Sequence, residues 1–97
     1  MISTHVLDTE RGEPRSGLTV GLYRGDELVG EQKTDADGRI AELASGELEP
    51  GEYQLLFDVG GEFFRRIELT LSITDPTRHY HVPLLVAPYS CTTYRGS

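Results

Sequence analysis

Short segments rich in Val, Ile, Leu, Tyr and Thr, divided by Gly and Pro, run through the whole chain. Residues 67–73 alternate between apolar and polar side chains, and residues 18–23 place three apolar side chains on one face. A period of two is typical of a strand with one buried face, and regular punctuation by Gly and Pro is typical of β-sandwiches and barrels. The pattern predicts an all-β fold in which two sheets pack face to face.

Seven or eight strands are expected, and no helix of ordinary length. Residues 8–17 are predicted to form a loop, residues 35–38 a turn, and residues 45–49 a short helix at most. The predicted strands cover residues 2–7, 18–23, 27–34, a short edge segment that starts at Arg39 and Ile40, 53–57, 63–73, 79–86 and 90–94.

The length and charge of the chain limit its possible partners. Its 97 residues are enough for a single domain, 1–97. Sixteen acidic residues against nine basic ones give a net charge of -7, and no cluster of Lys and Arg is present, so we expect no nucleic-acid partner. No segment is apolar enough to span a membrane, the first residues do not have the pattern of a secretory signal, and a single cysteine cannot form an internal disulfide. We therefore expect a cytoplasmic protein without a membrane partner.

The three histidines are the groups most suited to chemistry. His79 and His81 lie two positions apart on a predicted strand, so their side chains share a face at a separation of about 6.5 to 7 Å. His5 lies in the first predicted strand, next to the hydroxyls of Ser3 and Thr4. The histidines could form one shared site, they could be satisfied side chains of the interior, or they could bind zinc together with a water molecule.

Four segments carry a resemblance to a known family. They are Ser-Thr-His-Val-Leu-Asp at residues 3–8, Asp-Gly-Arg at 37–39, His-Tyr-His-Val-Pro-Leu-Leu at 79–85 and the terminal Tyr-Arg-Gly-Ser at 94–97. In order and spacing, and over nearly the whole chain, they resemble the 5-hydroxyisourate hydrolases, the enzyme branch of the transthyretin family. Transthyretin, the hormone carrier, lacks these histidines and this tail.

The resemblance implies a transthyretin (prealbumin)-like sandwich of two four-stranded sheets, assembled as a homotetramer (a dimer of dimers) with its active sites in a channel between dimers. It implies hydrolysis of 5-hydroxyisourate to 2-oxo-4-hydroxy-4-carboxy-5-ureidoimidazoline in urate degradation, with no cofactor and no metal. The residues that match the family's catalytic positions are His5, Arg39 and His81. Those that match its substrate-binding pocket are His5, Arg39, His79, Tyr94, Arg95, Gly96 and Ser97.

The implied chemistry suits these residue types. An imidazole with a pKa near 6.5 takes a proton from water at neutral pH, and either His5 or His81 could be this base. The forked guanidinium of Arg39 stabilises charge that develops on a carbonyl oxygen, while Tyr94 and the chain end hold the substrate. Arg95 could instead pair with a carboxylate in a structural role.

The connection of residues 58–66 is shorter than is usual in the family, so its short helix should be truncated or missing. Two alternatives stay open: a binding protein of the same fold that does not turn its ligand over, and a zinc-dependent hydrolase that uses the three histidines.

Overall fold

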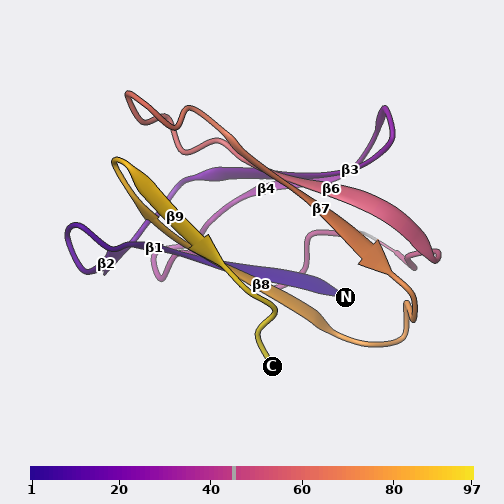
Figure 1. Ribbon diagram of the computed structural model, residues 1–97. Helices are drawn as coiled ribbons and strands as arrows, with labels where there is room; N and C mark the ends of the chain where they lie inside the picture. Colours follow the sequence, from indigo (N-terminus) through magenta and orange to yellow (C-terminus); the bar gives the residue numbers. More distant parts are fainter. Residues whose placement is uncertain (45) are drawn as a thin grey trace.

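The computed structural model describes residues 1–44 and 46–97, which form a sandwich of two β-sheets with no helix in these ranges (Figure 1). The predicted all-β, two-sheet architecture is confirmed. The strands are β1 (Ile2–Asp8), β2 (Glu13–Pro14), β3 (Thr19–Arg24), β4 (Glu27–Lys33), β5 (Arg39–Ile40), β6 (Gly51–Phe57), β7 (Ile67–Ile73), β8 (Tyr80–Ala87) and β9 (Ser90–Thr93).

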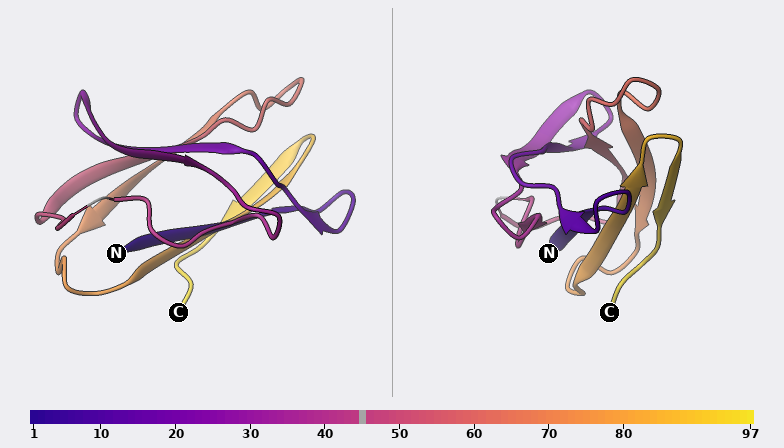
Figure 2. Two further views of the ribbon diagram at one scale, coloured as in Figure 1. Left: turned by 180° about the vertical axis from the view of Figure 1, so that it is seen from behind. Right: turned by 90° about the vertical axis from the view of Figure 1, so that its left-hand side faces the viewer.

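One sheet has the order β4-β3-β6-β7, and the other has the order β2-β1-β8-β9 with β5 also paired to β1 (Figure 2). β1 and β8 run parallel, whereas the other pairs are antiparallel. The second sheet therefore has five strands, and the expectation of four in each sheet is wrong for it. The physical reason is that β5 and β2 share one edge of β1: β5 pairs with Thr4 and His5, and β2 pairs with Leu7 and Asp8.

Several predicted boundaries move in the structure. The predicted loop 8–17 contains the short β2, and His79 precedes β8. The strand predicted at 63–73 begins only at Ile67, because backbone N–H groups of Gly60 and Gly61 donate to the carbonyls of Arg65 and Phe64 and close a loop. This loop contains no helix, as the short connection predicted. The short helix considered at 45–49 is not formed at residues 46–49, and Ser45 lies outside the described residues.

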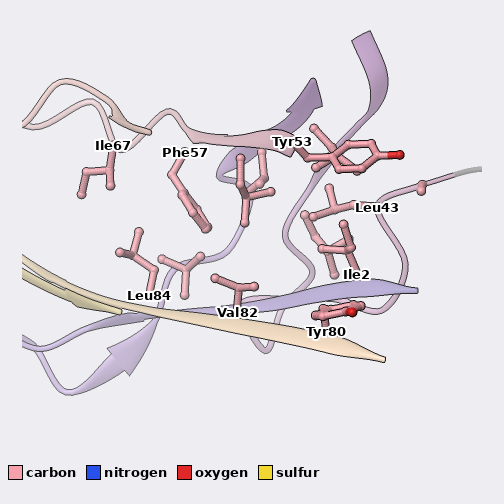
Figure 3. Packing of buried hydrophobic residues seen from close by; sticks show 14 of the residues in the cluster. Ile2, Leu43, Tyr53, Phe57, Ile67, Tyr80, Val82 and Leu84 are labelled. Atoms are coloured by element: carbon pink, nitrogen blue, oxygen red, sulfur yellow. The ribbon is translucent and has the colours of Figure 1, made fainter. Parts of the chain in front are cut away.

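The core fills the space between the two sheets, and the alternation of side chains decides which residues enter it. In Figure 3, Phe57 of β6 points toward Val82 and Leu84 of β8, while Tyr53 lies at the other end of the core with Leu43 and Ile2. Phe57 and Leu84 are fully buried, and burial of such a side chain contributes about 1.5 to 3 kcal/mol. Because one face of β1 and β8 packs into this core, their other face carries the polar side chains of Ser3, His5 and His81.

No helix among the described residues is both long and apolar enough to cross a membrane.

Candidate functional site

The outer face of β1 and β8 holds two of the candidate side chains. In the parallel register of these strands, Ser3 lies opposite His81 and His5 lies opposite Pro83. Ile2 and Val6, which alternate with Ser3 and His5 along β1, are buried in the core. Alternation then directs Ser3, His5 and His81 away from the core, onto one shared surface.

Arg39 is placed beside His5 by the turn that precedes it. The carboxylate of Asp35 accepts hydrogen bonds from the backbone N–H groups of Asp37 and Arg39, each at 2.9 Å. Gly38 has a φ of 74°, and its carbonyl accepts a 2.8 Å hydrogen bond from the N–H of Val6. The turn therefore sets Arg39 directly opposite His5. Within residues 1–44 and 46–97, no carboxylate lies within ion-pair distance of its exposed guanidinium.

His79 and His81 are joined through one hydroxyl. The Oγ atom of Ser3 lies 2.7 Å from Nε2 of His79 and 2.8 Å from Nδ1 of His81. The centroids of the two imidazole rings are 6.4 Å apart, close to the separation that the sequence spacing predicts. The sequence analysis did not select Ser3 as a candidate site residue, although Ser3 lies within the first matching segment.

The chain end is held against His81. The N–H of Gly96 donates a 2.7 Å hydrogen bond to the carbonyl of His81, and this isolated pair continues the register of β8 with β9. A Cβ atom at Gly96 would lie 2.6 Å from Cδ2 of His81, so only a residue without a side chain fits this contact. In Figures 1 and 2 the C-terminus lies on the outer side of the sheet that contains β1 and β8.

The other tail residues differ in their surroundings. Tyr94 is 58% exposed, and Ser97 is also exposed. The Cζ atom of Arg95 lies 4.5 Å from the ring centroid of Tyr80, which is a core residue and therefore belongs to the face of β8 opposite His81. The structure thus brings Gly96 to the histidines, but it places the Arg95 guanidinium on the other face, against an aromatic ring rather than a carboxylate.

The electrostatics of this surface favour a neutral His81. Partial burial lowers the pKa of His81, and the positive charges of Arg39, His79 and His5 lower it further. The strand registers are consistent with this influence, because Arg39 lies opposite His5 on β1 and His81 lies opposite Ser3, two positions away. At neutral pH this imidazole therefore keeps a free lone pair that can accept a proton.

The zinc alternative requires a compact group of ligands. Among the described residues, no three His, Cys, Asp or Glu side chains are grouped so that they could hold a metal ion.

Comparison with known proteins assigns the chain to a family. The model of the HIUase/Transthyretin family matches residues 2–96. This chain belongs to that family. A curated relative, a 5-hydroxyisourate hydrolase of Mesorhizobium japonicum, is 42% identical over 113 aligned positions, which cover 99% of this chain and 91% of the relative. The alignment is longer than the whole chain, so the relative has residues that this family member lacks.

Two solved structures are similar to this family member over nearly its whole length. The structure of Klebsiella pneumoniae 5-hydroxyisourate hydrolase superimposes with a TM-score of 0.91 at 36% identity, covering 99% of this chain and 98% of the other. Sea bream transthyretin, solved in complex with thyroxine, has a TM-score of 0.86 at 24% identity, covering 98% and 93%, which shows a shared fold alone.

Proposed function

We propose that this chain is a 5-hydroxyisourate hydrolase of urate degradation. The observation that carries the proposal is that strand register puts His5, Arg39 and His81 on one outer face of the sheet, with no carboxylate of the described residues within ion-pair distance of the Arg39 guanidinium. Family membership and nearly full-length similarity to 5-hydroxyisourate hydrolases support it.

We assign the role of general base to His81. Its lowered pKa keeps the imidazole neutral at physiological pH, so it takes a proton from the water that attacks the substrate carbonyl. Negative charge then develops on the carbonyl oxygen, and the guanidinium of Arg39 donates hydrogen bonds to that oxygen. His5, opposite Arg39, orients the water or the substrate ring. General acid–base catalysis of this kind contributes about 10²- to 10⁴-fold to a rate.

The chain end completes the proposed pocket. Gly96 packs against His81, the exposed Tyr94 supplies a ring for the flat substrate, and the hydroxyl of the exposed Ser97 supplies a further hydrogen-bonding group. Arg95 acts indirectly, because its contact with Tyr80 holds the tail in place. His79 contributes through its hydrogen bond with Ser3. A C-terminal tag should therefore reduce activity more than an N-terminal tag, and equal activity of the two tagged forms would contradict the role of the chain end.

The direct test is the decay of 5-hydroxyisourate absorbance, with substrate made freshly by urate oxidase. We expect the protein to accelerate the decay, and we expect Arg39→Ala to lose most of this acceleration. Arg66→Ala is a matched control, because Arg66 is an exposed arginine in the connection before β7. Absence of acceleration by the wild-type protein would leave a ligand-binding protein of this fold, and loss of turnover on chelation would favour the zinc alternative.

We further propose that the enzyme is a homotetramer formed by pairs of dimers. Among the described residues, the outer edges of β7 and β9 have no strand partner, and the two strands lie along the same side of the sandwich (Figure 2). A cavity of about 450 Å³ between them is lined by the half-buried Leu69 and Leu71. Unpaired strand edges beside apolar side chains favour pairing with a second copy. Light scattering should give the mass of four chains, and a fully active monomer would contradict this assembly.

We place the enzyme in the cytoplasm, where a single cysteine stays reduced. Fractionation of the source cells tests this location.

A further inference from the structure

The hydroxyl of Ser3 is the only atom of the described residues shown to bond both His79 and His81. Ser3 is 6% exposed and lies directly opposite His81 in the β1–β8 register. With ring centroids 6.4 Å apart, the imidazoles are joined by this Oγ atom and not by a direct hydrogen bond.

The hydrogen count of this group permits two arrangements. A hydroxyl has one hydrogen, so Ser3 donates to one ring nitrogen and accepts from the N–H of the other. In the first arrangement Ser3 donates to Nε2 of His79 and accepts from Nδ1–H of His81, which leaves Nε2 of His81 without a proton. In the second arrangement Ser3 donates to Nδ1 of His81 and accepts from Nε2–H of His79.

We propose that Ser3 is a positioning residue that passes a proton between His81 and His79, so that His81, Ser3 and His79 form a relay from the active site to solvent. The proposal rests on the proposed function, because it concerns the proton that hydrolysis releases.

In the first arrangement, three proton transfers link the attacking water to His79. Water gives a proton to Nε2 of His81 as its oxygen bonds to the substrate carbonyl carbon, whose π electrons move onto the carbonyl oxygen. His81 releases its Nδ1 proton to Oγ of Ser3, and Ser3 releases its own proton to Nε2 of His79. The outcome is a neutral His81, an unchanged hydroxyl, a positive charge on His79 and a negative charge on the oxygen beside Arg39.

The direction of the relay follows from the surroundings of the two rings. His79 is exposed, whereas His81 is half-buried. The nearby positive charges of Arg39 and His5 also disfavour a protonated, positively charged His81. A product with a carboxyl and a ureido group leaves one excess proton at neutral pH, because the carboxyl ionises and a ureido nitrogen is not basic. An exposed imidazole at the end of the relay delivers that proton to water.

The test compares Ser3→Ala with Thr4→Val. Thr4 is the neighbouring hydroxyl residue, is 1% exposed and donates a 2.6 Å hydrogen bond to the carbonyl of Val82, so Thr4→Val removes a buried hydroxyl that does not contact a histidine. We expect Ser3→Ala to lower kcat by about 10- to 100-fold with little change in KM. This loss of kcat should be smaller than the loss caused by removing the imidazole of His81. Thr4→Val should lower the melting temperature with kcat within about 3-fold of wild type, and Ser3→Thr, which keeps the hydroxyl, should restore most of kcat.

Two further readouts do not depend on stability. Imidazole nitrogen NMR of the wild-type protein should show Nδ1 of His81 and Nε2 of His79 as nitrogens that are hydrogen-bonded to a hydroxyl, and Ser3→Ala should shift both signals. The dependence of kcat on the fraction of deuterium oxide in the solvent should indicate that more than one proton is transferred in the rate-limiting step of the wild-type protein. The same measurement on Ser3→Ala should indicate transfer of a single proton.

Acceleration by the wild-type protein together with an unchanged kcat in Ser3→Ala would overturn the relay alone. An equal loss of kcat in Thr4→Val, or nitrogen signals of both histidines that Ser3→Ala leaves unchanged, would also overturn it. No acceleration by the wild-type protein would overturn the proposed function, and the relay with it.

Discussion

Substitution of Gly96 by alanine should disable the site while leaving the sandwich intact. Gly96 follows the last strand, and its N–H donates to the carbonyl of His81, so the backbone at this position cannot easily move away. An alanine Cβ atom would lie 2.6 Å from Cδ2 and 3.3 Å from Cγ of His81, and 3.4 Å from Cγ of Pro83. The clash is therefore directed at the edge of the imidazole ring.

The size of the effect follows from these distances. Carbon atoms in contact are normally about 3.5 to 4.0 Å apart, so relief of the clash requires a shift of about 1 Å between the ring and the tail. A misplacement of about 1 Å in a catalytic constellation can reduce a rate by about 10²-fold. Stability should change little, because the substitution lies at the half-exposed chain end and outside the core cluster.

The assay is kcat/KM for 5-hydroxyisourate decay, with the melting temperature measured in parallel. Cys91→Ala is the control, because Cys91 is an exposed residue of β9 in the same hairpin. We expect about 10²-fold loss for Gly96→Ala and no loss for the control. If Gly96→Ala keeps more than about a third of the wild-type kcat/KM, the packing of the tail on His81 is not needed for activity.

Three further predictions concern the base, the core and the turn. Because the pKa of His81 is below its ordinary value of 6.5, the acidic limb of kcat/KM should fall at a pH below 6.5; an inflection above 6.5 would contradict His81 as the base. As the pH falls, His81 is protonated in the unfolded chain at a higher pH than in the folded chain, and this favours unfolding. Urea titrations should therefore show that the contribution of His81 to the free energy of unfolding is constant above pH 6.5 and is lost as the pH falls below 6.5. Phe57→Ala, at a fully buried position, should lower the free energy of unfolding by about 3 to 5 kcal/mol in the same titrations, and a loss below 1 kcal/mol would contradict its place in the core. Gly38→Ala should cost at least about 1 to 2 kcal/mol, because φ is 74° and a Cβ atom would lie 2.5 Å from the carbonyl oxygen of Val6, and kcat/KM should fall as Arg39 moves; unchanged kinetics would show that this turn does not set Arg39.

The strands and turns of this protein were predictable because their signals are local. The alternation in residues 67–73 reports a face that is buried against the sandwich, and the turn at residues 35–38 has the carboxylate and the glycine that its geometry requires. The prediction failed at residues 63–66, where Phe63 and Phe64 extend the apolar pattern but backbone hydrogen bonds from two glycines close a loop. A loop of this kind competes with the strand through contacts that side-chain periodicity does not report.

The chemistry of the site depends on a pairing that the sequence did not determine by itself. Ser3 and His81 are 78 positions apart, and they meet because β1 and β8 pair in parallel with Ser3 opposite His81. The resemblance pointed to the histidines and to Arg39, but it did not single out the hydroxyl that joins His79 to His81, nor the placement of Arg95 on the opposite face. The sequence thus determined which segments become strands, through local alternation and turn residues. Only the tertiary structure decided which side chains share a surface, because the register between distant strands is set by the burial of their inner faces in the folded core.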